Sequence, residues 1–263
     1  MKELSVVIPA LDEAQKIRQD VESAAAFFSE AGLKGEIIVV DDGSTDGTSS
    51  VARGAEVPSG TELKVIRLEE NRGKGQAVRT GVLASSGDVV LFADSGNCVP
   101  YANALPQIRR IRAGELDVAL ASRRHRETVI HRDRPWKRRI LSRLFHLAAV
   151  LVARLPRSIS DSQCGFKLYR GDAARELYQA CRTSGFLFDL EIIMRAQKRG
   201  LRIAEFPVEW TCDLDTRLRP RSDAPRVLRE LLEIRRRTGG HPPKGHPAPS
   251  EPEETVRNDQ GVP

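Results

Sequence analysis

The sequence predicts an α/β fold in which a mostly parallel sheet is flanked by helices, and three observations support this. Short runs rich in Val and Ile, typical of strands buried on both faces, recur through the first half of the chain. Segments with apolar residues at helical spacing separate these runs. The 263 residues are 40% hydrophobic and 30% charged, which fits a globular chain and excludes collagen-like, disulfide-scaffold and wholly disordered classes.

Strands and helices are expected to alternate in the first half. A first strand over Leu4–Pro9 precedes a helix that opens at Asp12 and Glu13 and extends to about Glu30. The next expected elements are strands at Glu36–Val40 and Leu63–Leu68, a helix at Lys74–Ala84, and strands at Asp88–Ala93 and Leu116–Ala121. Ligands of parallel sheets gather at the carboxyl ends of the strands, so the loops after these strands are the candidate site.

The second half has a different pattern. In chain order we expect a helix at Pro135–Leu155, a strand at Phe166–Tyr169, helices at Asp172–Cys181 and Leu187–Arg199, a strand at Arg202–Trp210 and a helix at Pro225–Arg237. Residues 238–263 are rich in Pro, Gly and charge without an apolar period, which predicts a disordered tail.

Positive charge is concentrated in one segment. The net charge is +6, and Arg123 to Arg143 alone carry nine Lys or Arg against two acids. Such a patch suits phosphate, an anionic lipid surface or nucleic acid. Because Trp136 is its single aromatic residue, a stacking platform is missing and we expect no nucleic-acid partner. The apolar stripe that follows, over Ile140–Leu155, suits an interfacial helix and a core-packing helix equally.

The cysteines and the N-terminus indicate the compartment. Cys98, Cys164, Cys181 and Cys212 form no CxxC pair, so we expect free thiols in a reducing compartment. The N-terminus lacks a signal-peptide pattern, and the longest apolar run is far shorter than the roughly 20 residues of a membrane span. The expected location is the cytoplasm, either free or peripheral at the inner face of the membrane.

Acidic residues follow two of the buried strands. VIPALDE (Val7–Glu13) and IIVVDDGSTDGT (Ile37–Thr48) each end a strand in a polar turn, and a carboxylate at Asp41 or Asp42 is costly there unless it binds something. The structural alternative is a tight turn in which a residue such as Ser44 caps the next helix. That alternative does not account for Asp41, which we interpret as a binding residue.

Lys74 lies in a glycine-flanked turn, Arg72-Gly73-Lys74-Gly75, directly before a helix. Free backbone N–H groups and a cation converge in such a turn, which suits an anion. Taken alone, the motif fits an ordinary helix start with a solvated lysine equally well.

Together these segments resemble glycosyltransferase family 2, which has the GT-A fold, a Rossmann-like α/β fold. More narrowly, about Leu4 to Arg237 resembles polyprenyl-phosphate glycosyltransferases of the dolichyl-phosphate β-glucosyltransferase and dolichol-phosphate mannosyltransferase kind. The narrower resemblance is carried by NRGKGQAVRTG (Asn71–Gly81), ASR (Ala121–Arg123), DSQCGFKLYR (Asp161–Arg170), FDLEI (Phe188–Ile192) and FPVEW (Phe206–Trp210).

The resemblance implies one transferase domain over residues 1–237, with a nucleotide-sugar-binding half (1–123) and an acceptor-side half (124–237). It implies nucleotide binding by Pro9, Ala10, Leu11, Glu13, Asp41, Asp42, Lys74, Asp94 and Arg123. It implies acceptor or phosphate binding by Arg124, Arg138, Gln163, Arg217 and Arg219. The implied catalytic residues are Asp94, Asp161 and Asp189, whereas Glu191 caps the helix or pairs with Arg195.

The metal-binding motif departs from the family pattern. The family has two acids flanking one residue, followed four residues later by Pro, and alignment on Pro100 places them at Asp94 and Gly96. The motif is therefore Asp-Ser-Gly, and Asp94 is the expected ligand of Mg²⁺ or Mn²⁺. One carboxylate suffices where substrate phosphates and waters complete the coordination.

The resemblance therefore implies an inverting transferase that moves a hexose from a nucleoside diphosphate sugar to a polyprenyl phosphate, with UDP-glucose favoured over GDP-mannose. One alternative is a family 2 transferase with a soluble hydroxyl acceptor. Another is a nucleotide-sugar-binding protein without turnover. The expected partners are the nucleotide sugar and a polyprenyl phosphate or anionic membrane surface. Further expected partners are a membrane protein or a second copy of the chain.

Overall fold

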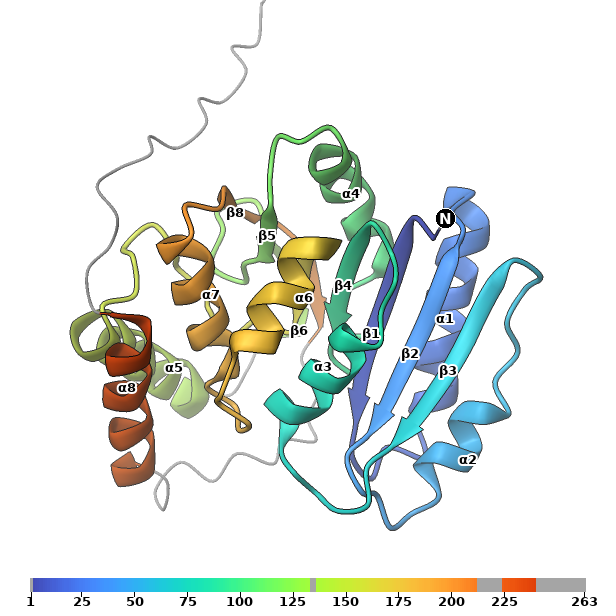
Figure 1. Cartoon of the computed structure of the whole chain (residues 1–263), viewed down its shortest axis with the longest axis horizontal. Coiled ribbons are helices and arrows are strands. Elements are labelled where there is room, and N and C mark those ends of the chain that lie inside the picture. The colour runs from blue at the N-terminus through green and yellow to red at the C-terminus, as the bar shows by residue number, and fades with distance from the viewer. Residues whose placement is uncertain (1, 133–135, 212–223, 240–263) are drawn as a thin grey trace, which may run out of the picture.

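The computed structural model describes residues 2–132, 136–211 and 224–239, with backbone alone for 132, 136–141 and 224–226. Its main sheet has the order β3-β2-β1-β4-β7-β5-β8 (Figure 1). The strands are β1 (Leu4–Ala10), β2 (Gly35–Asp41), β3 (Thr61–Arg67), β4 (Val89–Ala93), β5 (Val118–Ala121), β7 (Phe166–Arg170) and β8 (Ile203–Phe206). A small second sheet pairs β6 (Val129–Arg132) with β9 (Glu209–Thr211).

Helices cover both faces of the main sheet. They are α1 (Ile17–Ala31), α2 (Thr48–Arg53), α3 (Lys74–Leu83), α4 (Leu105–Arg112), α5 (Trp136–Ala148), α6 (Gly171–Ala180), α7 (Phe188–Lys198) and α8 (Ala224–Thr238), with the short η1 (Tyr101–Ala104) and the π-helical η2 (Ala149–Ala153). Residues from α1 and α4 share one core with the sheet, and residues from α3, α6, α7 and α8 share the other. Figure 1 shows α3, α6 and α7 on the viewer's side of the sheet and α1 behind it. The α/β prediction is confirmed.

One strand breaks the parallel pattern. β7 is antiparallel to both of its neighbours, β4 and β5, whereas the other pairs in the main sheet are parallel. The loop that precedes β7 therefore reaches the same edge as the carboxyl ends of β4 and β5. This topology brings the DSQCG segment to the predicted ligand edge.

Several element boundaries differ from the expectations. The first helix begins at Ile17, and Asp12, with a left-handed φ of 46°, lies in the loop before it. The expected strand Arg202–Trp210 is two strands, β8 and β9, in different sheets. The expected helix Pro135–Leu155 is α-helical to Ala148 and π-helical beyond it. Helix α4 and strand β6 were not assigned from the sequence.

The sheet topology defines where a ligand would bind. From β1 the chain passes to β2 and β3 on one side and then to β4 on the other. The strand order thus reverses between β1 and β4, and the crevice at the carboxyl ends of such a pair is the usual ligand site of an open α/β sheet.

Candidate active site

Hydrogen bonds join the loops after β1 and β2. The N–H of Asp12 donates to Ser44 Oγ at 2.8 Å, and the N–H of Glu13 donates to Thr48 Oγ1 at 2.8 Å. In return, the N–H of Thr45 donates to Asp12 Oδ1 at 2.9 Å. Helix α2 itself has no side-chain cap, so the expectation that Ser44 caps the following helix is wrong. The hydroxyl instead fixes the loop that contains Leu11 and Glu13.

The two acids at the end of β2 act on different neighbours. Asp41 is 1% exposed, and its carboxylate accepts hydrogen bonds from the N–H of Ser44 and the hydroxyl of Ser49. Asp42 accepts the N–H of Arg72 at 2.8 Å and the N–H of Gly73 at 2.9 Å. Burial raises the pKa of Asp42, and these two N–H groups oppose the rise. Asp41 therefore shapes its own turn, whereas Asp42 fixes the loop that leads to Lys74.

A second buried carboxylate holds the Lys74 loop from the other half of the chain. Glu191 in α7 accepts the N–H groups of Arg182 and Thr183. It also forms the predicted ion pair with Arg195. The carbonyl of Ser184, in the loop thus fixed, accepts the N–H of Gln76 at 3.1 Å. The start of α3 is therefore held between the loops after β2 and α6.

Lys74 and Asp94 meet directly. Lys74 Nζ lies 2.7 Å from Asp94 Oδ1 and donates a hydrogen bond to Oδ2 at 2.8 Å. Burial would lower the pKa of Lys74, but Asp94 and Asp189 outweigh burial and raise it, so the ammonium stays charged. The two side chains are 25% and 32% exposed, so a ligand can reach the pair. A Cβ at Gly165 would overlap the Asp94 carboxylate, so this approach requires glycine there.

The turn after Asp94 suits the glycine that stands at the second position of the motif. Gly96 has a φ of 95°, which L side chains rarely adopt. Its N–H donates to both carboxylate oxygens of Asp20, at 3.0 Å each. Asp20 is buried in α1, and burial raises its pKa to about 6. Asp20, which was not among the predicted site residues, therefore fixes this turn from α1.

The residues present fit a divalent cation held by one protein carboxylate. Among the described residues, no group of three or more His, Cys, Asp or Glu is arranged to hold a metal ion. Asp94 Oδ1, however, is buried and accepts no hydrogen bond within the described part of the chain, although it lies beside the Lys74 ammonium. A cation at this oxygen would share the carboxylate with Lys74, and its other ligands would be phosphate and water.

Arg123 and Asp161 form a two-point ion pair at the end of β5. Arg123 donates from Nε to Oδ2 and from Nη2 to Oδ1, both at 2.6 Å, and from its backbone N–H to Oδ2 at 3.0 Å. Burial would raise the pKa of Asp161, but Arg123 outweighs burial and lowers it. Asp161 is therefore ionised, and it accepts a longer fourth hydrogen bond from the N–H of Gln163 at 3.4 Å. The guanidinium also lies 5.8 Å from the ring centre of Trp210, which is buried.

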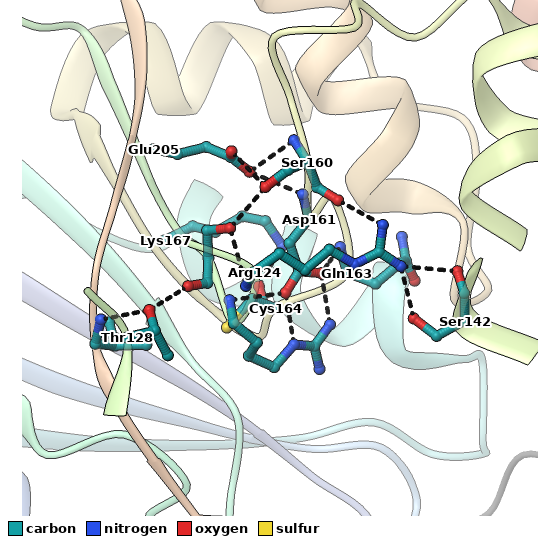
Figure 2. A network of polar contacts seen from close by, with 12 residues as sticks. Arg124, Thr128, Ser142, Ser160, Asp161, Gln163, Cys164, Lys167 and Glu205 are labelled. Carbon is teal, nitrogen blue, oxygen red and sulfur yellow. Dashed lines mark hydrogen bonds and ion pairs between the residues drawn. The ribbon is translucent and has the colours of Figure 1, made fainter. Parts of the chain in front are cut away.

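Glu205 and Arg124 fix the loop that contains Asp161 (Figure 2). Glu205 in β8 accepts the N–H groups of Ser160 and Asp161 at 3.0 and 2.8 Å. Arg124 donates to the carbonyls of Ser160 and Ser142 at 2.9 and 3.0 Å, which ties this loop to α5. Arg124 therefore bridges two segments, and its expected role in acceptor binding stays a prediction.

Two other predicted residues lie beside this loop. Gln163 has a buried Nε2 with no hydrogen-bond partner in the part of the chain that the structure describes. Asp189, at the start of α7, is 3% exposed and forms an ion pair with Lys167. Lys167 and Lys74 both lie against the ring of Phe92, so Asp189 is close to the Lys74–Asp94 pair.

The other predicted residues have mixed outcomes. Pro9 and Ala10 are buried in β1, and Leu11 and Glu13 are half-buried in the following loop. The side chain of Arg138 lies outside the described residues, as do Arg217, Arg219 and the tail from residue 240. Cys98, Cys164 and Cys181 are free thiols.

Helix α5 and η2 have two apolar faces. Ala149, Ala153 and Leu155 are buried against the core. Leu144, Leu147 and Leu151 are 59%, 53% and 65% exposed, and their spacing places them on one face. One side of the helix packs against the core and the other is exposed, so the two alternatives considered for this apolar stripe each describe one side. None of the helices in the described ranges is long and apolar enough to cross a membrane.

The fold and site define an α/β protein that gathers acids and cations at the topological switch point of a parallel sheet, where phosphorylated nucleotide ligands bind. Residues 5–178 match the family model described as Glycosyl transferase family 2. The chain belongs to this family and is a glycosyltransferase.

Similar proteins cover most of the chain. The dolichyl-phosphate beta-glucosyltransferase of Drosophila melanogaster is 38% identical over 221 residues, which are 80% of this chain and 67% of the relative. The proteins of the same name from Dictyostelium discoideum and Saccharomyces cerevisiae are 31% and 32% identical, with 88% of this chain covered in each case and 73% and 74% of the relatives.

A solved structure confirms the fold. Glucosyl-3-phosphoglycerate synthase from Mycobacterium tuberculosis in complex with UDP is 25% identical, has a TM-score of 0.61, and matches over 90% of this chain and 80% of that chain. The same enzyme with Mn²⁺, UDP and glucosyl-3-phosphoglycerate has a TM-score of 0.63 at 24% identity, over 93% and 82% of the two chains. The expected GT-A architecture is therefore confirmed.

Proposed function

We propose that this chain is an inverting glucosyltransferase that moves glucose from UDP-glucose to a polyprenyl phosphate. The names of the relatives support the sugar and the acceptor class, and the UDP complex of the structural neighbour supports the nucleotide. The single observation that carries the proposal is that one loop joins two ion pairs at the ligand edge: Asp161 of this loop pairs with Arg123, and its Gly165 carbonyl accepts the N–H of Asp94, which pairs with Lys74.

On the donor side, the base binds beside Asp41, whose buried turn is fixed by Ser44 and Ser49. The diphosphate lies between Lys74 and Arg123. Both cations are held in place before the ligand arrives, by Asp94 and Asp161 respectively. Fixed positive charge at the point where negative charge develops lowers the barrier to loss of the diphosphate.

Asp94 is the residue that would hold Mg²⁺ or Mn²⁺, through Oδ1, which accepts no hydrogen bond from the described residues and lies 2.7 Å from Lys74 Nζ. When bound, the ion would act as a Lewis acid on the diphosphate. Lys74, beside the same carboxylate, binds the adjoining phosphate oxygens and needs no change of protonation state to do so.

A phosphate acceptor makes a strong protein base unnecessary. The second pKa of a phosphate monoester is about 6, so the acceptor oxygen is already mostly ionised near neutral pH. Asp161 agrees with this chemistry, since Arg123 keeps it ionised and occupies it with three hydrogen bonds. Its role is to orient Arg123. Gln163 offers to the acceptor a buried side-chain amide nitrogen that has no hydrogen-bond partner among the described residues.

The acceptor side is the α5 face. Leu144, Leu147 and Leu151 form an exposed apolar row beside the Asp161 loop, to which Arg124 ties the helix. Arg143 and Arg154 on the same helical segment are exposed as well. Apolar side chains flanked by arginines suit a lipid chain and an anionic surface, so we place the chain peripherally at the cytoplasmic face of the membrane.

Transfer of labelled glucose tests the proposal. The purified chain is incubated with UDP-[¹⁴C]glucose, Mn²⁺ and dolichyl phosphate in detergent, and the organic phase is counted. The proposal expects label in the lipid phase and one UDP released for each glucose transferred. If the label stays in the aqueous phase and a soluble hydroxyl or phosphorylated acceptor is glucosylated, the proposed acceptor class is wrong. UDP-glucose binding without transfer to any acceptor would support a binding protein.

A further inference from the structure

Lys167 is a fully buried lysine that the proposed mechanism does not use. It lies in β7, opposite Phe92 of β4 and Leu120 of β5, and its exposed fraction is 0%. Its Nζ donates to the carbonyl of Cys164 and to Asp189 Oδ1, both at 2.6 Å. A buried ammonium is expensive even when it is paired, so its presence beside the donor site needs an explanation.

Lys167 and Lys74 lie against the same ring. Lys167 Nζ is 5.6 Å and Lys74 Nζ 5.5 Å from the ring centre of Phe92, so one aromatic side chain contacts both cations. Each cation has its own carboxylate, Asp94 for Lys74 and Asp189 for Lys167. The Lys167–Asp189 pair thus lies next to the Lys74–Asp94 pair and is more deeply buried.

One oxygen of Asp189 remains unoccupied by the pair. Oδ1 accepts the hydrogen bond from Lys167, whereas Oδ2 accepts no hydrogen bond from any residue that the structure describes. Stability alone does not require this arrangement, because two apolar side chains of similar volume generally stabilise a core as well as a buried ion pair does. The pair fixes the orientation of one carboxylate and leaves its second oxygen without a hydrogen bond from the described residues.

We propose that Lys167 is a positioning residue that holds Asp189 so that its Oδ2 accepts a hydrogen bond from a hydroxyl of the transferred sugar. This inference rests on the proposed function, since it needs a sugar beside the diphosphate held by Lys74. Asp189 is then the sugar-specific part of the site, and Lys167 acts through it without touching the donor. The nucleotide and its phosphates make no contact with either residue.

Comparison of UDP with UDP-glucose isolates the sugar contact. Calorimetry measures the dissociation constant of each ligand, with Mn²⁺ present, for the wild-type chain and for Lys167→Met. We expect the variant to bind UDP within about twofold of wild type, whereas its affinity for UDP-glucose falls roughly 10- to 100-fold, the loss that follows removal of one hydrogen bond to a charged group. A merely structural lysine would weaken both ligands together or neither.

The pH profile of transfer gives a second readout. Charged and titratable groups around Asp189 are Lys167 and Tyr169 from β7, Lys74 from α3, Asp94 after β4 and Tyr178 from α6. Burial raises the pKa of Asp189, and Lys167 is the largest opposing influence. Without Lys167 the carboxylate stays protonated to higher pH, so the acid limb of kcat/KM for UDP-glucose should move to higher pH in Lys167→Met.

Two further variants make the outcome decisive. Lys64→Met is the control, because it breaks an ion pair to the buried Glu36 at the β3 edge of the sheet, away from Lys167. It should leave both dissociation constants unchanged. If Lys167→Met does not fold, Asp189→Asn keeps the side-chain volume and must show the same selective loss of UDP-glucose affinity. Equal UDP-glucose affinity in the folded Lys167→Met or in Asp189→Asn overturns the inference. Failure of the wild-type chain to bind UDP overturns the proposed function instead.

Discussion

The clamp between Asp42 and the Lys74 loop gives a sharp test of how the donor site is built. In Asp42→Asn, the amide keeps one acceptor oxygen, whereas the carboxylate accepts the N–H groups of both Arg72 and Gly73. One charge-assisted hydrogen bond is lost and one N–H is left facing an amide donor. Hydrogen bonds to charged groups contribute about 1.5–3 kcal/mol, and Asp42 is 3% exposed, so solvent does not screen the loss.

The cost falls on the loop that presents Lys74 to the diphosphate. With about 1.4 kcal/mol for each factor of ten, UDP should bind roughly 10- to 100-fold more weakly, while uridine, which lacks phosphates, should bind as in wild type. Isothermal titration calorimetry with both ligands measures the two effects. Asp117→Asn is the matched control, since this buried acid bonds Arg170 and Arg202 at the other edge of the sheet and should leave the ratio unchanged. Equal weakening of UDP and uridine in folded Asp42→Asn would refute the reasoning.

Three further predictions concern the turn after β4. Asp94→Asn removes the proposed metal ligand, so Mn²⁺ should no longer tighten UDP binding; an unchanged difference between Mn²⁺ and EDTA would contradict this. Gly96→Asp restores the family's second acid but forces it to a φ of 95°, so we expect a loss of about 1–2 kcal/mol in urea unfolding and no gain in Mn²⁺ affinity. Burial raises the pKa of Asp20 from 3.8 to about 6, so between these values the folded carboxyl keeps a proton that the unfolded one has lost, and stability falls as pH rises, by on the order of 3 kcal/mol. Asp20→Asn should abolish that fall, so its unfolding free energy relative to wild type should increase from pH 4 to pH 7; a pH-independent difference would exclude the effect.

Much of the fold could be predicted because buried parallel strands have a plain signature. The runs ending at Pro9, Val40, Ala93 and Ala121 are strands in the structure, and they end at the ligand edge. Asp94 and Lys74 meet as the carboxyl-edge argument required, although they are 20 residues apart. The reversal of β7 could not be foreseen, because a short apolar run carries no information on strand direction.

The supporting residues of the site were harder to find. Asp20 lies on the apolar face of α1, with Ile17, Val21 and Ala24, and an acid on such a face is a signal that the sequence analysis passed over. Lys167 is a charged residue within the apolar run Phe166–Tyr169. It is the same kind of signal as Asp41, a charged residue at the end of the buried strand β2. Glu205 acts on a loop 44 residues away in sequence, so its partners become visible only in the folded chain. The pairing of Glu191 with Arg195 could be predicted from their helical spacing, but its contact with Thr183 depends on how the preceding loop folds back.

A structure of the chain with UDP-glucose and Mn²⁺ tests the central claim most directly. The account predicts the uracil ring beside Asp41, the diphosphate between Lys74 and Arg123, and the cation on Asp94. Well-ordered UDP-glucose bound away from the crevice between β1 and β4, with the Lys74–Asp94 pair untouched, would contradict it.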